Sequence, residues 1–128
     1  MDIRAALLAT AVLVTPLAAL AHGAPPAPAH GGTVAEGSGE HWVEMSVAGD
    51  QLTAWVSDED NKPIPAVQLG GKATILIDGK TQIVPLSPAA ENSLTGNLAA
   101  QPTGRMTAVL ALTAQGKPVQ AKFIIPAK

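Results

Sequence analysis

The stretch that decides the fold runs from residue 41 to residue 57, HWVEMSVAGDQLTAWVS. Apolar and polar side chains alternate in it on both sides of Gly49-Asp50, a dipeptide typical of a tight hairpin turn. The positions that share one face are apolar: Val43, Met45 and Val47, then Leu52, Ala54 and Val56. The other face carries Trp42, Glu44 and Ser46, then Thr53 and Trp55. This pattern predicts two antiparallel β-strands, each with one buried face.

The segments on either side repeat this pattern at a spacing of about ten residues, with Gly, Pro and Asp-rich turns between them. The further strands that we expect are 33–35, 72–77, 81–86, 93–98, 105–114 and 119–125. Pro85 and Pro88 predict that the 81–86 strand lies at an edge. The sequence therefore predicts an all-β protein, an antiparallel immunoglobulin-like β-sandwich of about seven or eight short strands, with a small barrel as the alternative.

The first 21 residues have the three parts of a signal peptide. Arg4 forms a short basic region, Ala5 to Leu20 is apolar, and Ala19-Leu20-Ala21 fits an A-x-A cleavage site. We expect cleavage after Ala21, export to the periplasm and no stable membrane insertion afterwards; an uncut membrane anchor is the alternative. The domain organisation that we expect is a signal peptide at 1–21, a Pro/Ala-rich linker at 22–29 and a single β-sandwich domain at 30–128.

Composition narrows the classes of function. The 128-residue chain has a net charge of −2 and no basic cluster, so we expect no nucleic-acid partner. It has no cysteine, which excludes disulfides and thiolate chemistry and fits a bacterial periplasm better than a disulfide-rich secreted module. The chain carries no motif of a known catalytic class, and we therefore predict that it is not an enzyme.

All three histidines lie within residues 22–41, which predicts a site near the start of the domain. His30 precedes a turn at Gly31-Gly32, whose glycines allow a positive φ and a close backbone approach, and His41 follows a turn at 37–39. A hairpin here would bring the two histidines close, and Glu44 adds a carboxylate. Imidazole and carboxylate ligands suit zinc or copper, so we predict a metal site of His30, His41 and Glu44. Cleavage after Ala21 would make His22 the first residue, whose α-amine and imidazole can chelate copper as a possible addition. Glu36 and Glu40 are further oxygen candidates.

Other conspicuous residues have structural explanations. The two tryptophans fall on successive strands, and packing in the core is favoured over a binding surface. Met45 and Met106 alternate with apolar neighbours, so we also expect them in the core. The acidic run Asp58-Glu59-Asp60 precedes Asn61-Lys62-Pro63 and lacks the pattern of a calcium loop, which predicts a solvated turn.

Four short motifs give the chain a resemblance to β-rich periplasmic domains of heavy-metal efflux systems, in particular to periplasmic adaptors of resistance-nodulation-division pumps. They are His30-Gly31-Gly32, His41-Trp42-Val43-Glu44, the turn 58–63, and Gly71-Lys72-Ala73-Thr74 followed by Asp78-Gly79-Lys80. The resemblance covers most of residues 29–97. It implies a periplasmic module that handles metal through the His-Gly-Gly segment and Glu44. A complete adaptor also has a long helical hairpin and a lipoyl-like domain, which this sequence lacks, so we do not expect it to bridge a pump by itself. A weaker resemblance to small periplasmic copper carriers rests on compartment, size and His22.

Two functions follow as expectations. The first is a periplasmic binding module for a divalent transition metal, copper or zinc, in metal efflux or resistance, with an efflux adaptor as a possible partner. The alternative is a metal-independent protein–protein interaction domain of an efflux assembly, whose edge strands add to a partner's sheet.

Overall fold

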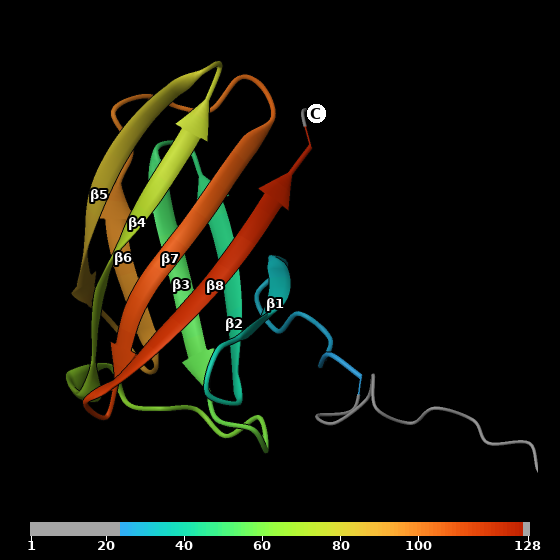
Figure 1. Cartoon of the computed structure of the whole chain (residues 1–128), viewed down its shortest axis with the longest axis vertical. Coiled ribbons are helices and arrows are strands. Elements are labelled where there is room, and N and C mark those ends of the chain that lie inside the picture. Colours follow the sequence, from blue (N-terminus) through green and yellow to red (C-terminus); the bar gives the residue numbers. More distant parts are fainter. Residues whose placement is uncertain (1–23, 127–128) are drawn as a thin grey trace, which may run out of the picture.

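The structure is a computed structural model, and it describes residues 24–126. Eight antiparallel strands and one turn of 3-10 helix make up the regular elements of this part of the chain (Figure 1). The strands are β1 (Thr33–Gly37), β2 (His41–Ala48), β3 (Gln51–Ser57), β4 (Leu69–Ile77), β5 (Lys80–Pro88), β6 (Ser93–Asn97), β7 (Met106–Ala114) and β8 (Lys117–Ile125). The helical turn η2 (Ala66–Gln68) lies between β3 and β4. The prediction of an all-β antiparallel sandwich of about eight strands is confirmed.

The strands form one continuous sheet in the order β1-β2-β3-β6-β5-β4-β7-β8, which folds over on itself (Figure 1). β2 and β3 are joined by the hairpin predicted at Gly49-Asp50, with Ala48 paired to Gln51. β5 connects the two parts of the sheet. Its pairing with β4 begins where Lys80 lies opposite Ile77, whereas only Ser87 and Pro88 pair with β6. The prediction that this strand lies at an edge is wrong for the sheet as a whole, because β5 lies between β6 and β4 and Pro88 pairs with Leu94. Pro85 itself lies where β5 pairs with β4 alone, so its missing N–H costs no ladder hydrogen bond to β6.

The two ends of the sheet approach each other. The Ser38 N–H, just after β1, donates a hydrogen bond of 3.0 Å to the backbone oxygen of Gln120 on β8. The Gln120 N–H in turn donates to the Ser38 hydroxyl oxygen at 2.8 Å. These two contacts nearly close the sheet into a barrel, so the structure combines the predicted sandwich with features of the barrel alternative.

The core is aliphatic, with one aromatic side chain. The predicted inward positions of β2 and β3 are confirmed, because Val43, Met45, Leu52, Ala54 and Val56 are all fully buried. They belong to one core cluster with inward residues of the other strands: Ala73, Ile75, Val84, Leu94, Met106, Ala108, Leu110, Leu112, Val119, Ala121 and Phe123. The prediction that the methionines lie in the core is therefore confirmed.

The prediction that the tryptophans pack in this core is wrong. Trp42 and Trp55 lie on the outer face of the sheet and belong to no part of the core cluster. They do not face each other directly, because Trp42 is paired with Ser57 and Trp55 with Glu44. Trp42 is nevertheless only 6% exposed, so something outside the sheet must cover it.

In the described part of the chain, no helix is long and apolar enough to cross a membrane.

Candidate functional site

The segment that precedes β1 covers the outer face of β2 and β3. We call residues 24–32 the N-terminal strap. It has no regular secondary structure, which agrees with the Pro-rich spacer predicted here. Between the strap and the sheet lies a small hollow of about 190 Å³. Its lining residues come from the strap, from β1 to β3 and from two loops: Pro26, Ala27, Ala29, His30, Val34, Trp42, Glu44, Trp55, Ser57, Asn61, Pro63, Glu91 and Asn92.

The Glu44 carboxylate holds the strap in place. Its Oε1 accepts a hydrogen bond from the Ala29 N–H at 3.0 Å, and its Oε2 accepts bonds from the N–H groups of His30 and Gly32, each at 2.9 Å. The His30 ring nitrogen Nδ1 lies 3.1 Å from Oε1. Glu44 is only 7% exposed. A buried carboxylate requires such partners, so these four contacts explain how a charge is accommodated beneath the strap.

The two glycines after His30 make this geometry possible. Gly31 has a φ of +70°, a backbone conformation that favours glycine, and it turns the chain toward β1. Gly32 lies so close to β2 that a Cβ atom there would collide with the backbone oxygen of Met45 and crowd the Glu44 side chain at 3.1 Å. The glycine pair thus supplies both a positive φ and a close backbone approach at this point.

The His30 ring is fixed on its face as well as at its edge. It stacks on Trp55 with ring centroids 4.0 Å apart and an angle of 2° between the planes. Trp55 is in position because its register partner across the β2–β3 hairpin is Glu44. An ionised carboxylate can only accept, so Nδ1 carries the proton of a neutral His30 and Nε2 keeps its lone pair. No hydrogen bond among the described residues uses Nε2, and the His30 side chain is 35% exposed.

Hydrogen bonding sets the charge state of Glu44. Burial alone raises the pKa of the Glu44 carboxyl, but the hydrogen bonds from Gly32, from the His30 ring and from the N–H groups of His30 and Ala29 together outweigh burial. The pKa therefore lies below its ordinary value of 4.5. The carboxyl is ionised at neutral pH, which suits its role as an acceptor for several donors.

This shift predicts a specific loss of stability in acid. Because the folded-state pKa is lowered, Glu44 contributes its full stabilisation above the ordinary value, and the contribution is lost as pH falls through the lower, folded pKa. We expect the difference in unfolding free energy between the wild type and Glu44→Gln to shrink between about pH 5 and pH 3. Urea unfolding at a series of pH values measures it. An equal difference at pH 6 and pH 3 would show that the charge of Glu44 does not stabilise the fold.

The structure brings together two of the predicted metal ligands and separates the third. His30 and Glu44 are in contact, but His41 lies on the opposite face of β2, buried, with its Nδ1 3.1 Å from the backbone oxygen of Ser38. The alternation of side chains along a strand explains this separation, because His41 and Glu44 are three positions apart. Glu36 lies on β1, on the same outer face as Glu44. His22 falls outside the described residues.

Glu40 lies beside the acidic turn 58–60 and not beside His30 and Glu44. Its side chain lies beside Glu59, and a hydrogen bond between the two, together with repulsion from Glu40, Asp60 and Asp58, raises the pKa of Glu59. In the same turn, Asp58 Oδ1 accepts hydrogen bonds of 2.9 Å from the N–H groups of Asp60 and Lys62. This arrangement is the exposed, self-bonded turn that the sequence predicts, and it takes Glu40 away from His30.

Within residues 24–126, no group of three or more His, Cys, Asp and Glu side chains is arranged to hold one metal ion. Sequence reasoning found His30 and Glu44 but missed the stacking of His30 on Trp55 and the role of Glu44 as an acceptor for backbone N–H groups. The hairpin register, which places Trp55 opposite Glu44, was the available signal.

Comparisons with known protein families, with characterised proteins and with solved structures find no match to this chain.

Proposed function

We propose that this chain is a periplasmic binding module for a divalent transition metal, copper or zinc, and that His30 is its central ligand. The observation that carries the proposal is the state of the imidazole: Nδ1 is bonded to Glu44, and Nε2 is left without a partner among the described residues. Histidines that bind metals commonly donate their other ring N–H to a carboxylate, which fixes the ring and makes the free nitrogen more basic. Stacking on Trp55 fixes the ring further.

In this proposal, Glu44 orients the ligand and does not bind the metal itself. Its two oxygens already receive three backbone N–H groups and the His30 ring, so metal coordination would have to displace donors that hold the strap. This differs from the role of direct ligand expected from the sequence. A hydrogen-bonded carboxylate behind a ligating histidine is worth roughly 10–100-fold in metal affinity.

One imidazole makes a weak site, so further donors are needed. The proposed exported form begins at His22, eight positions before His30, and offers an α-amine and a second imidazole. Nitrogen donors of this kind favour copper over harder cations. A site assembled from a fixed ring and a chain end can accept and release its ion readily, which suits a role in metal efflux or resistance and delivery to an efflux adaptor.

The test is isothermal titration of the form that begins at His22 with Cu(II) and with Zn(II). We expect 1:1 binding that is lost in His30→Gln, falls by roughly 10–100-fold in Glu44→Gln, and weakens in acid because protons compete for imidazole. His41→Gln is the matched control, since its ring is tied to the Ser38 carbonyl on the other face of β2. Heat that is equal in the wild type and in a variant without His22 and His30 would remove the proposal.

One observation favours the alternative, a metal-independent interaction domain. β8 is the last strand of the sheet, and β1 touches it through Ser38 and Gln120 without forming a ladder. Near the end of β8, Ile124 is 51% exposed. An edge strand with an exposed apolar residue can take up a strand of a partner. A partner that remains bound in the presence of a chelator would favour this alternative.

A further inference from the structure

The two outer faces of the sandwich differ in what covers them. The strap lies over β2 and β3, as described above. The other layer consists of β5, β4, β7 and β8, which pair in that order (Figure 1). We call the outward side of this layer the four-stranded face. Its large apolar side chains are exposed, so no segment of residues 24–126 covers it as the strap covers the first face.

Apolar side chains are neighbours on the four-stranded face. Leu76, Thr107 and Ile124 are register partners on β4, β7 and β8 and form one row across the layer. Ile83 and Val109 lie in the next row, on either side of the same β4 residue. Ile83 is 63% exposed, Ile124 51% and Leu76 43%, and these are three of the four exposed large apolar side chains of the described residues. The exposed apolar residues of the domain are therefore concentrated on one face.

Charge is divided between the two layers in the same way. The outward positions of the four-stranded face carry Lys72 and Lys122 and no carboxylate. The strands of this layer and their ends hold every basic side chain of the described residues except Lys62: Lys72, Lys80, Arg105, Lys117 and Lys122. Seven of the nine described acidic side chains lie instead between residues 36 and 60, on β1, β2 and the turns around β3. The domain thus has a positive side, which is the bare apolar one.

The composition of the four-stranded face favours a lipid surface over a protein. Exposed apolar patches mark sites for proteins or membranes. Protein interfaces are enriched in aromatic residues, methionine and arginine and depleted of lysine, whereas this face offers aliphatic residues, threonine and lysine. A second copy docked face to face would place lysine against lysine, which is unfavourable.

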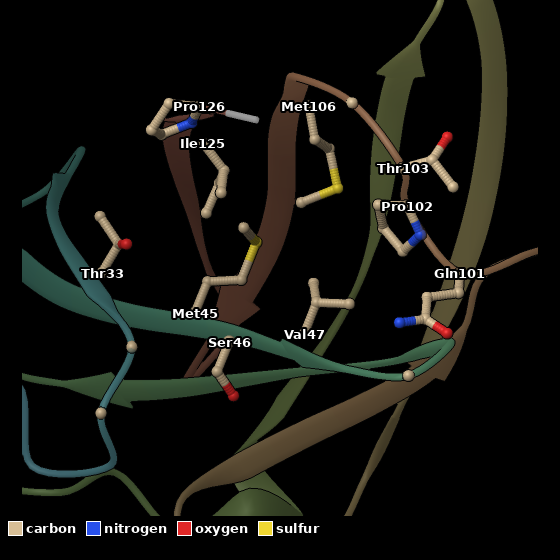
Figure 2. Close-up of a pocket in the computed structure, with 14 residues that line it drawn as sticks. Thr33, Met45, Ser46, Val47, Gln101, Pro102, Thr103, Met106, Ile125 and Pro126 are labelled. Carbon is tan, nitrogen blue, oxygen red and sulfur yellow. The ribbon is translucent and has the colours of Figure 1, made fainter. Parts of the chain in front are cut away.

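The four-stranded face also offers no hollow for an anchoring side chain of a partner. A hollow of about 310 Å³ lies at the end of the barrel where β8 finishes, and Figure 2 shows Met45, Val47 and Met106 directed into it from inside the sandwich. None of the outward residues of the four-stranded face lines this hollow or the one beneath the strap. A face of short side chains without a hollow suits a planar partner.

We propose that the four-stranded face docks on a lipid bilayer with anionic headgroups. Leu76, Ile83 and Ile124 enter the headgroup region, and Lys72 and Lys122 attract the negative charges. The acidic layer is repelled by the same charges, so the domain lies with its strap away from the membrane. The contact is peripheral and inserts no segment. It does not depend on the proposed metal site, which remains open to water in this orientation.

The experiment is sedimentation of the form that begins at His22 with phosphatidylcholine vesicles, with and without phosphatidylglycerol. This form contains all eight strands. We expect it to bind only the vesicles that contain phosphatidylglycerol, and to be released by salt. Lys122→Gln should weaken binding about fivefold, because a lysine near an anionic surface contributes about that factor. Lys62→Gln removes the same charge from an exposed position outside the face and should leave binding unchanged.

A second pair of variants tests the apolar contribution. Ile83→Ser should weaken binding about tenfold, since the isoleucine would no longer be buried in the headgroup region. Val67→Ser is the control, because Val67 is 86% exposed but lies on η2, outside the face. All the substituted side chains are exposed, so each variant should keep the unfolding midpoint of the wild type.

Tryptophan fluorescence tests the orientation. Trp42 and Trp55 lie on the outer face of the other layer, so brominated acyl chains in the bound vesicles should leave their emission unquenched. Quenching would overturn the proposal, and so would equal binding without phosphatidylglycerol or equal effects of Lys122→Gln and Lys62→Gln. Absence of vesicle binding would also overturn it, and would assign the face to an acidic protein or, if the chain self-associates and Ile83→Ser abolishes this, to a second copy.

Discussion

Replacing Glu44 with alanine should lower the free energy of unfolding by about 2–3 kcal/mol, since hydrogen bonds to a charged group each contribute about 1.5–3 kcal/mol and some donors will find water instead. Three backbone N–H groups and the His30 ring lose their common acceptor in this variant. The strap should then detach from the sheet. Trp42, now 6% exposed, would enter water.

Two measurements check this result. Urea unfolding gives the loss of stability, and the emission of the two tryptophans should shift to longer wavelength before the domain unfolds. Asp50→Ala is the control, because Asp50 is an exposed turn residue, and such changes usually alter stability by less than about 0.5 kcal/mol. An unfolding midpoint in Glu44→Ala equal to that of the wild type would show that the strap adds nothing to the stability of the barrel.

Replacing Phe123 with alanine should have the larger effect, a loss of about 3–5 kcal/mol. Phe123 is 2% exposed and is the one aromatic side chain of a core otherwise built from aliphatic residues and methionine. Its removal leaves a cavity that neighbouring strands, each fixed by its ladder, cannot fill. Because domains of this size are stable by only about 5–15 kcal/mol, such a variant would approach the limit of folding.

The neighbouring residue provides the control for this substitution. Ile124 is next to Phe123 on β8 but faces outward and is 51% exposed. Ile124→Ala should therefore change stability by less than about 1 kcal/mol in thermal or urea unfolding. A loss in Ile124→Ala as large as that in Phe123→Ala would mean that the assignment of inner and outer faces on β8 is wrong.

The sequence predicted those features that depend on near neighbours. The two-residue alternation in 41–57 and the Gly49-Asp50 turn specify the β2–β3 hairpin and its faces, because both signals are local. Gly31 and Gly32 were likewise recognisable as a turn. The pairing of β3 with β6 and of β4 with β7 was not predictable, since it depends on which distant strands meet in the closed sheet.

In the candidate site, too, the features that depend on near neighbours were predictable from the sequence, and those that depend on distant packing were not. Glu44 and His30 were identified from residue type and proximity, and the opposite orientation of His41 follows from strand geometry. The tryptophans were assigned to the core because large apolar residues are usually buried there, but Trp42 is buried on the outer face of the sheet, where it lines the hollow beneath the strap.

The contacts of the strap also determine when it can form during synthesis. Residues 24–32 leave the ribosome before their partners Glu44 and Trp55, which arrive only with the second and third strands. The strap has no ladder of its own to hold it in the meantime. Although it is synthesised first, the strap must therefore dock after that hairpin exists.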